Sequence, residues 1–258
     1  MRELFDEVAG KSPLDPQEAV RRATRTPQRK RFYETAGVAA TDGGFSITLD
    51  GRPIKTPSGK TVVAPNREIA DAIAAEWQAQ QETIDPLTMP LTRFANSVVE
   101  AVGERADAVA DDIAKYLGTD LLFYRAGHPE ALVAKEAAHW DPIVFWAAEG
   151  LGAHFILAEG IMHVRQPDKA IAAARAAFPK NPWAIAALHV VTTVTGSALL
   201  ALALAHGVRE PEQIWAAAHV DEDWNIEKWG IDDEVAARRA ARLVDFQAAT
   251  RILKALNG

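Results

Sequence analysis

The longest apolar stretch of the chain covers residues 183–205 and contains no Asp, Glu, Lys or Arg. A helix that is apolar on every side belongs either in a membrane or at the centre of a larger helical protein. Its middle third is unfavourable for a membrane span because it holds the polar or small residues His189, Thr192, Thr193, Thr195, Gly196 and Ser197. We therefore expect one helix over 183–205, buried on all sides in a soluble bundle, with Gly196 and Ser197 at a close crossing with another helix.

Between residues 32 and 65 apolar and polar positions alternate with period two, which is typical of an antiparallel sheet. In the segment FSITLD the apolar residues fall on one face. Asp50 and Gly51 then form a strong signal for a two-residue hairpin turn. Because Pro53 cannot donate a hydrogen bond to a neighbouring strand, the strand that contains it should lie at a sheet edge or carry a bulge.

Asn66 is the expected N-cap of the first helix, in which Ile69, Ile73 and Trp77 recur at helical spacing. Trp77 is thus expected to face the core and to have a structural role. Prolines interrupt the segment that follows, and a second helix begins near Pro90. We place a domain boundary in this connector.

From Pro90 onward the helical period dominates, with helices expected over 90–102, 105–117, 130–150, 168–178, 183–205, 212–229 and 233–256. Two short segments, 119–126 and 153–164, look extended. The expected fold class is α+β, a small mainly antiparallel β domain followed by a larger helical domain. The ranges are a basic, partly disordered arm over 1–31, a β-rich domain with one helix over 32–88, and a helical domain over 89–258.

Composition narrows the class of protein. A chain of 258 residues with 48% hydrophobic and 24% charged residues is an ordinary globular protein, and its lack of cysteine excludes disulfides and thiol chemistry. The first 16 residues resemble neither a secretory signal nor a transit peptide, so a cytoplasmic bacterial protein is expected. A net charge of -7 argues against nucleic acid as a partner. The basic run over 21–31 is read as a solvated arm.

The sequence contains few residues in patterns typical of catalysis. The sequence holds no Walker loop, no GxGxxG after a strand, no GxSxG and no HExxH. His139 is interpreted as a packed histidine. His219, Glu222 and Asp223 form the one metal-type cluster, but a di-metal site in a bundle needs a second Glu-x-x-His motif. A carboxylate-metal hydrolase that uses these three residues stays open as the alternative function.

The segment HVDEDWNIEKWGIDDE, residues 219–234, holds seven acids, one lysine and two tryptophans. On a continuous helix Asp221 falls on the apolar side with Ile214 and Trp229, so it needs a partner such as Lys228 or an arginine. The acids at 223 and 227 fall on the opposite side. Two interpretations are open: a solvated acidic face with one buried ion pair, or an acidic docking surface rimmed by tryptophan.

Several motifs resemble the assembly chaperones for the catalytic sector of F-type ATP synthase. They are RFYETAGV, GGFSITLDGRPIKTPSGK, AAEWQAQQETIDPLTMPLTRFAN, DLLFYRA, WDPIVFWAAEGLG and DEDWNIEKWG, in the order that the family shows. The resemblance covers nearly the whole chain from Arg31 onward. It implies a β-rich N-terminal domain, a helical C-terminal domain, and no catalytic activity, cofactor or metal.

The resemblance further implies that the protein binds the unassembled alpha subunit and shields the surface that the beta subunit later covers. The family places functional weight on the acidic helix and on the tryptophan of AEWQ. We expect a partner-binding set of Glu222, Asp223, Glu227 and Trp224. A structural role is expected for Trp77, Asp221, Trp229 and Gly196. A monomer that neither binds nucleic acid nor inserts into a membrane completes the expectation.

Overall fold

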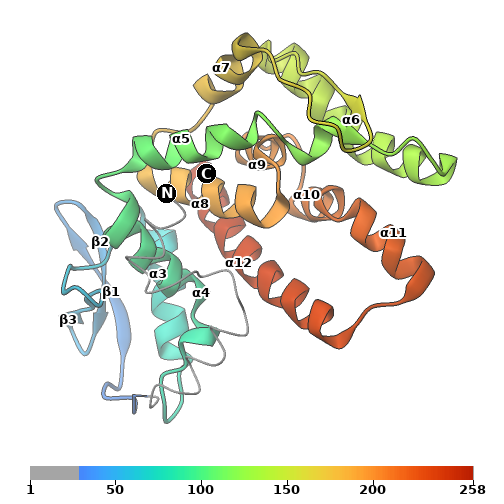
Figure 1. Ribbon diagram of the computed structural model, residues 1–258. Helices are drawn as coiled ribbons and strands as arrows, with labels where there is room; N and C mark the ends of the chain where they lie inside the picture. The colour runs from blue at the N-terminus through green and yellow to red at the C-terminus, as the bar shows by residue number, and fades with distance from the viewer. Residues whose placement is uncertain (1–28, 258) are drawn as a thin grey trace. The chain divides into compact units, whose positions relative to one another are not determined.

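The computed structural model describes residues 29–257 and has the expected α+β class, with short antiparallel strands followed by helices (Figure 1). Its contacts divide these residues into two compact units, 29–105 with 254–257, and 106–253. Most of the predicted basic arm, up to residue 28, lies outside the described residues.

Unit 1 is built on a four-stranded antiparallel sheet of β1 (Ala36–Thr41), β2 (Gly44–Leu49), β3 (Arg52–Pro53) and β4 (Val63–Ala64). Strand β2 is central, because Thr48 pairs with both Gly37 and Pro53, and Phe45 pairs with both Ala40 and Ala64. Two strands therefore share one edge of β2 while β1 covers the other.

The predicted hairpin turn is confirmed. Asp50 and Gly51 both have positive φ angles, 47° and 77°, as a type I′ turn requires. The Asp50 carboxylate also accepts hydrogen bonds from the backbone N–H groups of Glu34 and Thr35, at 3.1 and 2.9 Å. These bonds lower the pKa of Asp50, chiefly the one from Thr35. Pro53 lies in a two-residue strand that pairs with β2.

Helix α3 (Arg67–Gln78) packs against β1 and β2. The side chain of Asn66 caps it by accepting from the N–H of Ile69 at 2.9 Å, as predicted. Ile69 and Ile73 are buried, whereas Trp77 is half-buried at the rim of this core. Its ring meets Tyr33 edge-on with centroids 5.7 Å apart. A structural role for Trp77 stays a prediction.

The structure keeps the helical turns up to residue 102 in unit 1. They are the 3-10 helix η1 (Pro86–Thr88), α4 (Pro90–Ser97) and the π-helix η2 (Val98–Val102). Glu76 of α3 explains this, because its carboxylate accepts from the N–H groups of Leu91 and Thr92 at 2.7 and 2.8 Å and so caps α4. The boundary between the two units therefore lies after Arg105, whereas the sequence predicts a domain boundary between residues 88 and 89.

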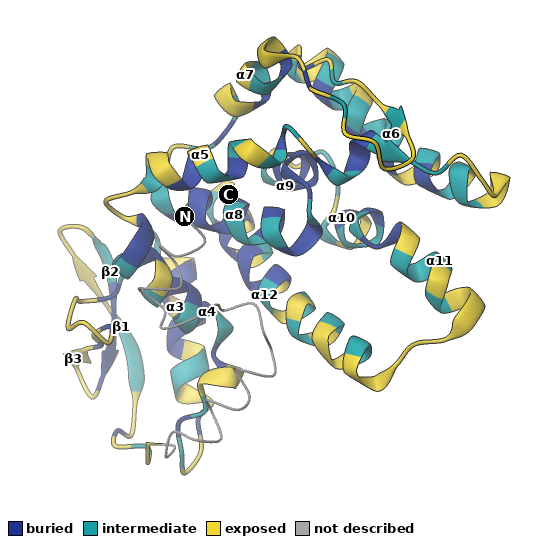
Figure 2. Ribbon diagram, in the orientation of Figure 1, coloured by how far each residue is buried: buried dark blue, intermediate teal, exposed yellow. Residues whose placement is uncertain are grey.

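Unit 2 is helical around a buried pair of helices, α8 and α9. Its elements are α5 (Ala106–Tyr116), η3 (Leu121–Phe123), β5 (Tyr124–Arg125), α6 (Glu130–Leu151), β6 (Ala158–Glu159), α7 (Asp168–Ala176), α8 (Pro182–Thr195), α9 (Ala198–Ala205), α10 (Pro211–Ala218), α11 (Val220–Trp229) and α12 (Asp233–Asn257), of which residues 254–257 belong to unit 1. Helix α5 packs on both buried helices, and α6 and α10 pack on α9. Figure 2 shows α8 and α9 mostly in the buried colour.

The prediction of one helix over 183–205 is wrong, because the chain breaks between α8 and α9. Gly196 adopts a left-handed conformation with φ 71° and ends α8, and the Ser197 hydroxyl accepts from the N–H of Leu200 to start α9. Asp120, fully buried, adds a second cap by accepting from Leu199 N–H at 3.1 Å. These caps satisfy the backbone groups that a break exposes.

Gly196 does not lie at a close helix crossing either, since a Cβ added there would have no atom within 4 Å. Burial of the apolar stretch is largely as predicted. The half-buried positions in it are His189, Val190, Thr193, Gly196 and Ala205, and the other side chains are buried. Within residues 29–257, no helix is both long and apolar enough to cross a membrane.

The helix expected over 212–229 is also two helices. His219, with φ -121°, separates α10 from α11, and its side chain is buried. The two segments that look extended in the sequence do pair, because β5 and β6 form a short parallel ladder with Tyr124 opposite Ala158.

Candidate functional site

Helix α11 carries the acidic segment and buries only Val220 among its ten residues. The chain runs out along α11 and returns along α12, and Figure 2 shows the turn between them in the exposed colour. With so little apolar burial, α11 depends on polar contacts with its neighbours α6 and α12 for its position.

Each predicted partner-binding acid makes an ion pair inside the protein. Arg239 of α12 lies 2.5 Å from the Asp223 carboxylate and 3.8 Å from that of Glu222. Lys135 of α6 lies 2.7 Å from Glu227. The three carboxylates are a third to a half exposed, so solvent still reaches them. They attach α11 to both neighbours, and their exposed parts stay accessible to a partner.

Trp224 lies among these ion pairs. The ammonium groups of Lys135 and Lys228 are 5.3 and 4.8 Å from its ring centroid, which is within cation–π range. The ring is half-buried. Trp224, which the sequence predicts to bind the partner, therefore has its ring covered by two lysines.

Asp221 is exposed, contrary to the expectation that it lies on the apolar side. Its contact within the described residues is with another acid, and not with Lys228 or an arginine as predicted. It faces Glu136 of α6, whose side chain is buried and accepts from the N–H of Ala126 at 2.9 Å. Burial and the nearby Asp221 carboxyl raise the pKa of Glu136. The two acids thus form a carboxyl pair between α6 and α11, which the sequence pattern did not reveal.

Trp229, predicted to be structural, is 78% exposed at the last position of α11, and Ile231 beyond it is 43% exposed. The prediction is wrong because it assumed one helix from Ile214 to Trp229. The break at His219 changes the helical phase, so that Ile214 is buried in α10 while Trp229 points away from the core. The end of α11 therefore presents an indole to solvent.

The suggested metal cluster is engaged in other contacts. His219 Nδ1 donates to the carbonyl of Trp215 at 2.7 Å, and burial lowers the pKa of this histidine, which favours the neutral ring. Its Nε2 lies 3.7 Å from Glu222. Arg239 already faces both acids of the cluster. Between residues 29 and 257 no group of three His, Cys, Asp or Glu side chains could hold a metal ion.

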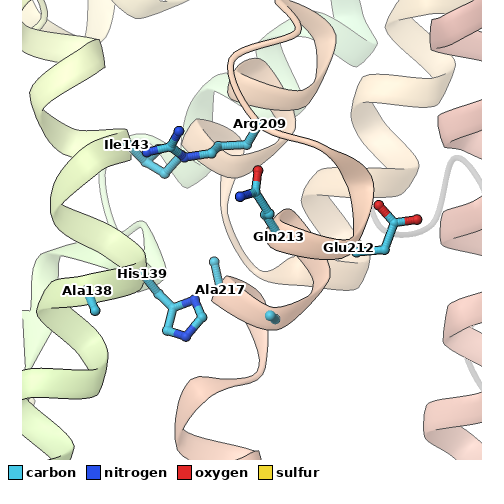
Figure 3. A pocket seen from close by; sticks show the side chains of 8 residues that line it. Ala138, His139, Ile143, Arg209, Glu212, Gln213 and Ala217 are labelled. Carbon is cyan, nitrogen blue, oxygen red and sulfur yellow. The ribbon is translucent and has the colours of Figure 1, made fainter.

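A groove of about 450 Å³ lies between α6 and α10 (Figure 3). Alanines and Ile143 form its apolar part, and His139, Arg209, Glu212 and Gln213 are its polar lining. Gln213 is committed to α10, since its side chain accepts from the N–H of Glu210 at 3.1 Å. Figure 3 shows the Glu212 carboxylate turned away from His139. The lining residues include no hydroxyl or thiol nucleophile that His139 could activate.

Solved structures resemble all or most of the chain. The Atu1473 protein of Agrobacterium tumefaciens is 46% identical, with a TM-score of 0.85 over 99% of this chain and 97% of that chain. Atp12 from Paracoccus denitrificans is 40% identical, with a TM-score of 0.82 over 88% of this chain and 97% of that chain.

More distant relatives agree. The mitochondrial protein atp12 of Schizosaccharomyces pombe is 22% identical over 217 residues, which is 79% of this chain and 75% of the relative. Residues 30–148 match the family model of the ATP12 chaperone protein. The chain therefore belongs to the ATP12 family, chaperones of ATP synthase assembly.

Proposed function

We propose that this protein binds the unassembled alpha subunit of the ATP synthase catalytic sector and covers the surface that the beta subunit later buries. The observation that carries the proposal is the exposed indole of Trp229 at the end of the acidic helix. The proposal assigns the protein no catalytic step and places it in the bacterial cytoplasm as a monomer.

Tryptophan is among the residues that contribute most to protein interfaces, and its exposure in the free protein leaves apolar area for a partner to cover. Gly230, with φ 79°, ends α11 directly after Trp229, and Ile231 adds a second exposed apolar side chain. Asp232, Asp233 and Glu234 follow, all exposed. This combination suits a client surface that has an apolar pocket with basic residues around it.

The proposal gives two roles to the acids of α11: they attract a basic client surface, and they attach α11 to its neighbours. These acids are Glu222, Asp223 and Glu227. Reversing their charge would break the pairs with Arg239 and Lys135 as well as any contact with the client. Trp229 makes a cleaner test, because its exposed ring contributes little to the fold.

We expect Trp229→Ala to weaken binding to the purified alpha subunit at least tenfold while leaving the melting temperature within about 2 °C, as an exposed position should. The matched control is Phe32→Ala, which removes another exposed aromatic ring, 60% exposed in unit 1. Isothermal titration calorimetry on both variants measures the difference. Equal affinities of Trp229→Ala and the wild type would remove Trp229 from the interface.

A further inference from the structure

Exposed apolar side chains concentrate in the segment between α6 and α7. Within residues 29–257 ten large hydrophobic side chains are exposed, and four of them lie in residues 156–162, which we call the apolar loop: Ile156, Leu157, Ile161 and Met162. Ile161 is 95% and Met162 76% exposed. Single exposed apolar residues are normal on a protein surface, but a cluster marks an interaction site.

A buried glutamine holds the base of the apolar loop in place. The Gln166 amide donates to the carbonyl of Ile156 at 2.9 Å and accepts from its N–H at 2.8 Å. The side chain of Gln166 is only 3% exposed, so these bonds are shielded from water. Both ends of the segment 156–166 are thereby joined.

The parallel ladder fixes the loop on its other side. Gly160 N–H donates to the carbonyl of Arg125 at 2.9 Å, directly after the pairing of β6 with β5. Arg125 is itself anchored, because its guanidinium donates to Asp141 and to the carbonyl of Leu122, both at 2.9 Å. Tyr124 and His163 add a contact of 3.3 Å. Ile161 and Met162 thus project from a braced turn rather than from a free strand.

The charge of the segment indicates what could cover it. Residues 153–164 contain one formally charged residue, Glu159, in a chain with a net charge of -7. The cores of protein interfaces are depleted of charge in the same way. An apolar client surface that is normally buried between subunits fits this loop, whereas a strongly basic or acidic surface would not gain from it.

We propose that the apolar loop is a second contact with the client, in which Ile161 and Met162 enter the apolar surface that the unassembled alpha subunit exposes before the beta subunit arrives. This inference rests on the proposed function. It names a contact surface separate in sequence from the acidic helix, with a different chemistry: apolar insertion instead of an aromatic and acidic contact.

The test is the double variant Ile161→Ser/Met162→Ser, titrated with purified alpha subunit. The expected result is at least tenfold weaker binding with an unchanged melting temperature, since both side chains are solvent-exposed. As control, Leu87→Ser/Val244→Ser removes two exposed aliphatic side chains elsewhere and should bind as the wild type does.

A second variant tests the brace. Gln166→Leu keeps Ile161 and Met162 but removes both bonds to Ile156, and it should weaken binding through a looser loop. Increased hydrogen exchange confined to residues 153–166 is its expected signature.

The outcomes separate the two proposals. If the wild type does not bind the alpha subunit, the proposed function fails. If Trp229→Ala weakens binding while the loop double variant binds like the wild type, the loop inference alone is overturned. A wild-type dimer that the double variant abolishes, or binding to phosphatidylglycerol vesicles lost in that variant, would likewise overturn it in favour of a second copy or a lipid surface.

Discussion

At the scale of single residues, Asp120 is a carboxylate fully buried among backbone N–H groups. It accepts from Leu122 at 3.2 Å and from Leu199 at 3.1 Å, and it thereby connects η3 to the start of α9. Burial raises the pKa of Asp120 to about 6, despite the hydrogen bonds that oppose the shift. The buried Asp120 side chain therefore holds the break between α8 and α9 in place and makes the stability of the fold depend on pH.

The pKa shift predicts the sign of that dependence. The pKa of Asp120 in the folded protein lies above the ordinary value of 3.8. Its contribution to the free energy of unfolding is therefore fully present below pH 3.8 and is lost as the pH rises through about 6. The loss amounts to about 3 kcal/mol of unfolding free energy. In Asp120→Asn this part of the slope should vanish. Urea unfolding of both proteins between pH 4 and pH 7.5 measures it, and parallel stability profiles would refute the assignment.

Local signals in the sequence succeeded where neighbouring residues decide the conformation. The Asp50–Gly51 turn and the Asn66 cap need only residues within a few positions of each other. Contacts across long distances in sequence were not predictable in this way. Glu136 faces Asp221. Arg239 forms ion pairs with Glu222 and Asp223, which the sequence predicts to bind a partner. The periodicity of one segment does not predict which side chains of another helix will contact it.

At the scale of elements, the two breaks at Gly196 and His219 shape unit 2. Each divides a segment that hydrophobic periodicity reads as one helix, because apolar patterning reports burial but not continuity. The break at Gly196 lets α8 and α9 pack on each other. The break at His219 turns α11 so that its end carries an exposed tryptophan. A candidate binding surface therefore arises from a helix break.

A substitution at Gly196 tests the first break. Alanine is strained at φ 71°, and with no atom within 4 Å of its Cβ the cost is one of backbone conformation, about 1 kcal/mol. Gly196→Asn should cost less, since asparagine tolerates the left-handed region. Chemical denaturation compares the two. If Gly196→Ala raised stability, as it would in the middle of a continuous helix, the break would be contradicted.

At the scale of the whole molecule, the structure combines buried helices with two sets of exposed side chains that we propose as contacts with the client. The end of α11 has an exposed indole and acidic side chains. The apolar loop has exposed aliphatic side chains and one formally charged residue, Glu159. Assembly chaperones must release their clients, which favours an interface of ordinary size, about 1,600 Å² in total or less, over an obligate one. A few exposed groups on a well-packed fold suit reversible binding of that kind.

The most direct test of this account is the affinity for the isolated alpha subunit, measured by calorimetry with and without the beta subunit. We expect the protein to bind the isolated alpha subunit with one-to-one stoichiometry and the beta subunit to displace it, because the proposed binding surface is the one that the beta subunit covers. A ternary complex in which the beta subunit binds without any loss of affinity, or equal binding to the assembled catalytic sector, would contradict the claim that the protein covers the beta-facing surface.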